Sequence, residues 1–284
     1  MEGTESLNRR AVLGGLALAS LTSRALAAPP TLTVSGRYRQ GGFAVGRTAP
    51  RAAVTVDGEA VGTASADGWF FVGFDRDAAP TSEIRVTTAD GSAVHRLDIT
   101  PGDFDVQRIG GLPADQVEPS DPILLERIRR EAALKAAAME SRLDADAFKS
   151  GFTIPLDVWR QSARFGGQRI LNGVPKRPHY GADLAARSGT AIHAPADGLV
   201  TLAEPSMHFE GGLTMIDHGQ GLTSFYLHQS RIDIAAGQSV TRGQTIGAVG
   251  ATGRATGPHL CWRLKWRSRN LDPMLLSGFL ARGA

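Results

Sequence analysis

The sequence has a single cysteine, Cys261, so no disulfide can form within the chain. Aromatic residues make up only 6% of it, while 34 glycines and 15 prolines favour short strands and turns over long helices. No run of Lys and Arg resembles a nucleic-acid patch, and acidic residues are interleaved with basic ones around a net charge of only +3, which argues against a nucleic-acid partner. With 42% hydrophobic residues, we expect a globular, mainly β protein.

The sequence also lacks long apolar runs. Its longest apolar stretch lies at the N-terminus. Residues Ala11 to Leu21 follow the pair Arg9-Arg10 and are too few to span a bilayer, and Ala25-Leu26-Ala27 supplies the small residues that a signal peptidase reads. We interpret residues 1–28 as a twin-arginine-type signal peptide and predict an exported, periplasmic protein without a stable membrane span after cleavage. The alternative is an uncleaved anchor or a chance apolar N-terminus.

The rest of the chain divides into three regions that differ in composition and in the spacing of their apolar residues. Residues 29–112 combine β-prone runs with turn pairs such as Asp57-Gly58, which predicts a small antiparallel β-sandwich. Residues 113–150 carry apolar residues at helical spacing after the capping pair Asp121-Pro122, which predicts a linker helix. Its apolar stripe would pack on a neighbouring domain or receive a partner. Residues 151–284 return to glycine-punctuated short strands and predict a second β domain.

Within residues 151–284, three short segments each carry two polar residues that are two or four positions apart. Residues two or four apart on an extended strand point to the same face, so each segment can aim both side chains into one pocket. A catalytic zinc site uses three such N, O or S ligands and leaves one position open. The pairs are His179 and Asp183, Tyr226 and His228, and His259 and Cys261.

The order of these segments and their glycines carries a specific resemblance. The motifs are His179-x-Gly181-x-Asp183, Ile216-Asp217-His218-Gly219-x-Gly221, Tyr226-x-His228 and Gly250-x-Thr252-Gly253-x-x-Thr256-Gly257-Pro258-His259. Together they resemble the signature of the lysostaphin/LytM-type zinc endopeptidases. The resemblance covers residues Phe165 to Leu275.

The resemblance implies an antiparallel β-sandwich of the barrel-sandwich hybrid type (the duplicated hybrid motif fold). It implies one Zn²⁺ per chain, a metalloendopeptidase activity on the peptide stems and cross-links of bacterial peptidoglycan, and a cell-wall regulatory partner. The implied metal ligands are His179, Asp183 and Cys261. The implied catalytic residues are His228 and His259, with Tyr226 orienting them.

Cys261 is the departure from the family pattern, which usually has a third histidine ligand at this position. A thiolate is a competent zinc ligand, but two anionic ligands leave less positive charge on the site, so we expect weaker Lewis acidity and a more alkaline activity optimum. Two alternatives remain: a metal-free pocket in which Cys261 is a buried apolar residue, and a degenerate relative that binds cell wall or activates a separate amidase.

Overall fold

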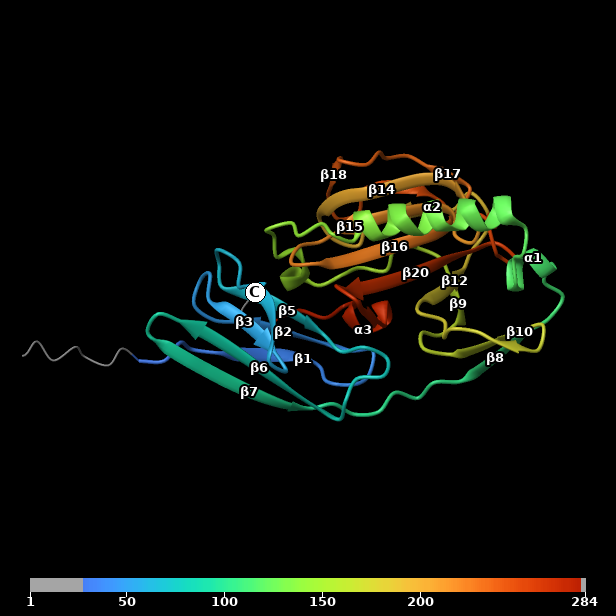
Figure 1. Cartoon of the computed structure of the whole chain (residues 1–284). Helices are drawn as coiled ribbons and strands as arrows, with labels where there is room; N and C mark the ends of the chain where they lie inside the picture. Colours follow the sequence, from blue (N-terminus) through green and yellow to red (C-terminus); the bar gives the residue numbers. More distant parts are fainter. Residues whose placement is uncertain (1–27, 282–284) are drawn as a thin grey trace, which may run out of the picture.

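The computed structural model describes residues 28–281, so residues 1–27 of the predicted signal peptide lie outside the described part. The prediction of a mainly β fold is confirmed, since strands follow one another through most of the described chain (Figure 1). Among the described helices, none is both long enough and apolar enough to cross a membrane.

The N-terminal part is built from two antiparallel sheets. One has the order β1 (Thr33–Arg37), β2 (Phe43–Arg47), β5 (Trp69–Gly73), and the other has the order β4 (Glu59–Thr63), β3 (Ala53–Val56), β6 (Thr81–Thr88), β7 (Gly91–Asp98). In β6 buried and exposed residues alternate, because Ile84 and Val86 face the core while their neighbours face water. Asp57 and Gly58 both have positive φ, as the expected tight hairpin turn between β3 and β4 requires.

The segment between the two parts of the chain wraps around the C-terminal part instead of forming one long helix. It contains β8 (Val106–Ile109), α1 (Ala114–Val117), α2 (Pro122–Ala138) and the 3₁₀ turn η1 (Ala147–Ser150). The Asp121 carboxylate accepts from the backbone N–H of Ile123 and caps α2, as the sequence predicts. β8 falls inside the predicted N-terminal domain, but it pairs in parallel with β10 (Gln168–Leu171), which pairs with β11 (Val174–Pro175).

A large antiparallel sheet forms the C-terminal part. In spatial order it contains β18 (Ser239–Val240), β14 (Gly198–Met207), β15 (Gly211–Asp217), β16 (Leu222–Gln229), β20 (His259–Trp266), β12 (Ala182–Ala185) and β9 (Arg160–Ala163), with β21 (Arg269–Leu271) beside β20. A small sheet of β13 (Ala191–His193), β19 (Thr245–Ala248) and β17 (Arg231–Ile232) and the short helix α3 (Pro273–Leu276) complete the part.

β15 and β16 are buried along their whole length because both faces of the large sheet are covered. One face, with Tyr226 and Trp262, belongs to the main apolar core. The other face, with Phe225 and Cys261, forms a second apolar cluster that includes Ala138 at the end of α2. The apolar side of α2 therefore packs on the sheet, and Figure 1 shows the helix running across β14, β15 and β16.

The main core continues from the N-terminal sheets into the C-terminal part without a break. Gly73 of β5 lies so close to Trp266 and Leu271 that an added Cβ would approach both to within 2.9 Å. Arg269 also donates from Nη1 to the carbonyl of Gly73 at 3.0 Å. β5 is consequently buried on both faces.

Candidate metal centre and catalytic histidines

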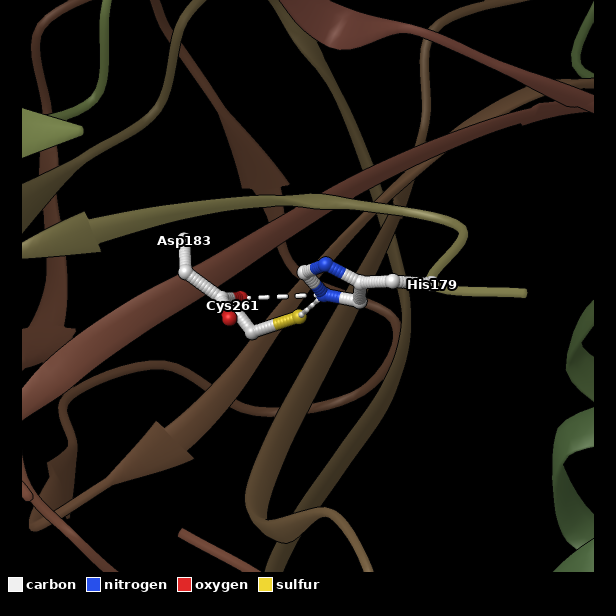
Figure 2. Close-up of side chains that lie close together, drawn as sticks. All are labelled: His179, Asp183 and Cys261. Carbon is white, nitrogen blue, oxygen red and sulfur yellow. Dashed lines mark hydrogen bonds and ion pairs between the residues drawn. The ribbon is translucent and has the colours of Figure 1, made fainter. Parts of the chain in front are cut away.

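The three predicted metal ligands lie side by side. Asp183 in β12 is the cross-strand partner of Cys261 in β20, and His179 reaches them from the loop before β12. His179 Nε2 lies 3.0 Å from Asp183 Oδ1 and 3.3 Å from Cys261 Sγ, as the dashed lines in Figure 2 show. All three residues are buried. His179 and Asp183 thus lie together as expected, although His179 comes from a loop and not from the extended strand on which the even spacing was argued.

Gly181 explains how this loop comes so close to β20. A Cβ at this position would lie 3.1 Å from Cys261 Sγ, 2.9 Å from the Trp262 carbonyl oxygen and 2.7 Å from a methylene of Arg263. Any side chain would push the loop away from the strand and separate His179 from Cys261. The glycine of the His-x-Gly-x-Asp motif is therefore required by close packing.

The charges of the three groups support one another. Burial disfavours the ionised form of Asp183, but the nearby His179, with smaller contributions from His259 and Arg169, outweighs it and holds the Asp183 pKa below its usual range. Burial also opposes charge on His179, yet the charges of Asp183 and Cys261 raise its pKa. The pocket is therefore built to hold a positive charge among the three side chains.

The donor set fits a zinc ion. One nitrogen, one carboxylate oxygen and one sulfur lie within 4.8 Å of one another, and these are the atoms zinc prefers. Donors bound to one tetrahedral zinc lie roughly 3.3–3.8 Å apart, so the observed separations need only a small adjustment. A proton shared by His179 and Asp183 would have to leave on metal binding.

His228 and His259 face each other beside this group. Their ring centroids lie 4.7 Å apart, and His259 Nε2 lies 3.8 Å from Asp183 Oδ1. His228 Nδ1 donates to the carbonyl of Thr252 and His259 Nδ1 to the carbonyl of Gly257, each at 2.8 Å. Since a carbonyl can only accept, both Nδ1 atoms carry the hydrogen, and each neutral ring has an unprotonated Nε2.

Burial keeps both rings neutral. It lowers the pKa of His228 to about 4, although the hydrogen bond to Thr252 opposes the shift. Burial also lowers the pKa of His259, against the opposing charge of Asp183. Near neutral pH both imidazoles can therefore accept a proton at Nε2.

Tyr226 does not join the histidines, and the expectation that it shares a face with His228 is wrong. Tyr226 points into the main core, is fully buried, and its hydroxyl lies 2.7 Å from the hydroxyl of Ser224. His228 would follow it on a regular strand, but its φ of 65° puts the backbone in the left-handed region and turns the imidazole to the opposite face. No regular strand alternation predicts such a turn for a histidine.

Two cavities flank the histidines and the candidate ligands. One, of about 810 Å³, lies between α2 and the face of the large sheet and is lined by His179. The other, of about 730 Å³, is lined by His259, by residues 256–258 and by β8. One candidate ligand thus borders the first cavity, and one of the two histidines borders the second.

The chain is similar to known peptidases over the segment that carries this site. The model of Peptidase family M23 matches residues 177–273. The peptidoglycan DD-endopeptidase ShyA of Vibrio cholerae serotype O1 is 42% identical over 123 residues, 42% of this chain and 28% of that protein. The DD-carboxypeptidase/endopeptidase Mpg of Neisseria meningitidis serogroup B is 38% identical over 127 residues, 44% of this chain and 29% of that protein.

A solved structure described as a candidate peptidase M23 from Pseudomonas aeruginosa extends the likeness beyond this region. It has a TM-score of 0.66 and 31% identity, with 85% of this chain and 95% of that chain covered. The chain belongs to peptidase family M23. All the predicted metal ligands and both histidines lie inside the M23 match, while the chain spans less than a third of the length of the two curated relatives.

Sequence reasoning missed two arginines at this M23 centre. Arg263 donates from Nε to Cys261 Sγ at 3.4 Å, and an Arg169 guanidinium nitrogen lies 3.5 Å from Asp183 Oδ2. Arg263 follows Cys261 by two residues on β20, so strand alternation could have identified it. Arg169 lies on β10, in a different sheet, and carries no such signal.

Proposed function

We propose that this M23 protein is a zinc-dependent endopeptidase that hydrolyses peptide cross-links of bacterial peptidoglycan. The observation that carries the proposal is the meeting of His179, Asp183 and Cys261 with two imidazoles whose Nε2 atoms are free to accept protons. The activities in the names of ShyA and Mpg support the substrate class.

His179, Asp183 and Cys261 would hold the metal. When bound there, zinc polarises the scissile carbonyl and increases the acidity of the attacking water. The guanidinium of Arg263 donates to the Cys261 sulfur and holds it in the ligand position. Arg169, close to Asp183, does the same for the carboxylate.

The two histidines would manage the protons of amide hydrolysis. One imidazole accepts a proton from the attacking water at Nε2, and in its protonated form it donates that proton to the departing amine. The second ring lies 4.7 Å away and is held through Nδ1 in the same way, so its Nε2 can accept a hydrogen bond from the attacking water and help to orient it. Tyr226 has no direct part in this proposal.

We propose a role for each of the other parts of the chain. Residues 1–28 would direct the protein to the periplasm, residues 29–112 and 113–150 would act as a positioning sandwich and a linker, and residues 151–284 would be the peptidase domain. The peptide stems of peptidoglycan would be the substrate, and a cell-wall regulatory partner would control access to it.

The direct test is digestion of purified peptidoglycan by the zinc-loaded protein, followed by separation of the released muropeptides and mass spectrometry. We expect cross-linked dimers to be converted to monomers with a new amino group, and we expect His259→Ala to abolish the conversion. His95→Ala, in β7 of the N-terminal part, is the matched control and should leave it unchanged. Binding of peptidoglycan without product formation would favour the wall-binding regulator instead.

A further inference from the structure

The histidine His228 lies in an irregularity of the large sheet, at the end of β16. Gln229 of β16 pairs with Gly212 of β15. The next pair joins Tyr226 to Thr214, so β16 has one residue more than β15 between the two pairs. This arrangement is a β-bulge, and bulges near active sites redirect a side chain. Here the redirected side chain is the imidazole of His228, whose φ is 65°.

The left-handed backbone of His228 needs support from its surroundings. It is unfavourable for any residue with a Cβ, and it persists only where neighbouring groups hold it. The backbone N–H of His228 donates to the carbonyl of Glu210, and its Nδ1 donates to the carbonyl of Thr252, each at 2.8 Å. The turn before β15 thus holds the backbone of the histidine, and the loop before β20 holds its ring.

The hydroxyl of Thr252 joins the two strands where the bulge closes. Its Oγ1 accepts from the backbone N–H of Gly212 and donates to the carbonyl of Gln229, each at 2.9 Å. These two residues are the pair that follows His228. One threonine therefore fixes the backbone that reverses the histidine and, through its own carbonyl, the imidazole itself.

Two glycines allow the threonine to come this close. A Cβ on Gly211 would lie 2.2 Å from Thr252 Oγ1, and a Cβ on Gly253 would lie 2.3 Å from the backbone nitrogen of Gly211. Both glycines have positive φ. The turn before β15 and the loop before β20 meet at these glycines, which brings the hydroxyl within reach of both strands.

The contribution of Thr252 to the position of His228 can be separated from the stability of the fold. Thr252 is exposed, whereas Gly212 and Gln229 are buried. On the inner side of the bulge, Gln229 Nε2 donates to the carbonyl of Tyr226 at 3.0 Å, a bond that does not involve the threonine. Removal of the Thr252 hydroxyl therefore leaves no cavity in the core and keeps the inner bond of the bulge.

We infer that Thr252 is a positioning residue of the reaction, which directs His228 into the site and keeps the hydrogen of its neutral ring on Nδ1. The inference rests on the proposed function, in which Nε2 of His228 must be free. A ring without the Thr252 carbonyl in place can carry its hydrogen on either nitrogen. A hydrogen on Nε2 prevents that atom from accepting a proton or a hydrogen bond.

The kinetic test removes the hydroxyl and keeps the shape of the side chain. On a soluble cross-linked muropeptide, zinc-loaded Thr252→Val should lose about 10- to 100-fold in kcat with KM changed less than about threefold, because a small displacement of a catalytic group is costly. Thr252→Ser keeps the hydroxyl and should have a kcat within about threefold of the wild type. An equal loss in Thr252→Ser and Thr252→Val would show that the hydroxyl is not the cause and would overturn the inference.

Thr245→Val is the matched control. Thr245 is also exposed, and its Oγ1 lies 3.4 Å from Nδ1 of His193, a histidine outside the site. This substitution should leave kcat unchanged. If circular dichroism shows that Thr252→Val does not fold, Thr252→Ala removes the same hydroxyl and has the same expected result.

NMR of the metal-free full chain with ¹⁵N-labelled histidine separates the inference from the proposed function. At neutral pH the wild type should show the hydrogen of His228 on Nδ1, with the signals assigned by their loss in His228→Ala. In Thr252→Val this hydrogen should be distributed over both nitrogens, while His259, which is held by the carbonyl of Gly257, keeps its hydrogen on Nδ1.

The two measurements together give distinct outcomes. If the wild type cleaves no muropeptide but Thr252→Val changes the tautomer of His228, the proposed function fails and the positioning of His228 by Thr252 stands. An unchanged tautomer of His228 in Thr252→Val would overturn the inference. An equal change at His259 would also overturn it, because it would show a general loss of the loop.

Discussion

Arg263 and Cys261 lie on the same face of β20, with the guanidinium Nε 3.4 Å from the thiol sulfur. Because the contact fixes the sulfur beside the other two candidate ligands, it links a residue outside the ligand set to metal affinity. The three candidate ligands and this arginine are therefore best tested together.

The amount of zinc bound per chain should depend on the three candidate ligands. We expect about one zinc per chain in the wild type and loss of it in Cys261→Ala and His179→Ala, because two ligands do not complete a site. Arg263→Gln should keep the ligands but lower zinc affinity about 10- to 100-fold. Mass spectrometry for metal and a competition assay with a chelator measure both effects. A wild type that stays metal-free after reconstitution under reducing conditions would contradict the proposed site.

The replacement Cys261→His should move the activity profile toward lower pH. It exchanges an anionic ligand for a neutral one, so the site gains positive charge and the attacking water becomes more acidic. The measurement is kcat/KM against pH for both proteins on one peptide. A wild-type profile that is no more alkaline than that of Cys261→His would refute the charge argument.

His228 and Tyr226 should respond differently to substitution although they are two residues apart. His228→Ala removes a proton acceptor and should lower kcat about 10²- to 10⁴-fold. Tyr226→Phe removes a hydroxyl in the core, so its activity should stay within a few-fold of wild type while stability falls by about 1 kcal/mol. Steady-state kinetics and chemical unfolding check the pair. A large kcat loss in Tyr226→Phe with unchanged stability would restore a catalytic role for Tyr226.

Asp272 should make stability depend on pH. Burial raises its pKa to about 6, against its hydrogen bond from the backbone of Met274. Since the folded state binds this proton more tightly than the unfolded state, the contribution of Asp272 to stability rises as pH falls from above 6 toward 4. Asp272→Asn keeps the cap of α3 without the charge, so it should be about 1–3 kcal/mol more stable at pH 7 and lose this dependence.

Urea unfolding at pH 7 and pH 5 measures the effect. Asp90→Asn, at the exposed turn between β6 and β7, is the matched control and should change neither value appreciably. An unchanged pH dependence in Asp272→Asn would show that another group is responsible.

Local spacing predicted a large part of the site. Asp183 and Cys261 meet as cross-strand partners, and His259 shares a face with Cys261 because it lies two residues away on β20, whereas His179 reaches them from the loop before β12. The same rule failed at His228, where a left-handed residue at the end of β16 reverses the direction of the side chain. The reversed imidazole bonds to the carbonyl of Thr252, 24 residues away, a contact that the local sequence does not encode.

The mainly β fold was predictable from turn pairs and glycine content, but the pairing between distant segments was not. Four residues of β8 carry no feature that distinguishes a partner in the N-terminal sheets from β10. The cavity beside His179 is a similar case, since Arg169 and Arg254 are separated by most of the C-terminal part and converge only through its topology.

The apolar core is continuous from β5 to Trp266 and Leu271. This continuity limits the movements of the N-terminal sandwich that could regulate the site. Swinging the N-terminal sandwich aside as a gate would expose a tryptophan, a leucine and the inner strand to water, at a cost of about 1.5–3 kcal/mol for each large side chain. The helix α2 is held on the large sheet by Ala138 in the second apolar cluster, by the ion pair of Lys135 with Glu210 and by the bond from the His208 backbone N–H to Glu131. The N-terminal sandwich and the C-terminal part therefore behave as one body, whose separation would expose the shared core to water.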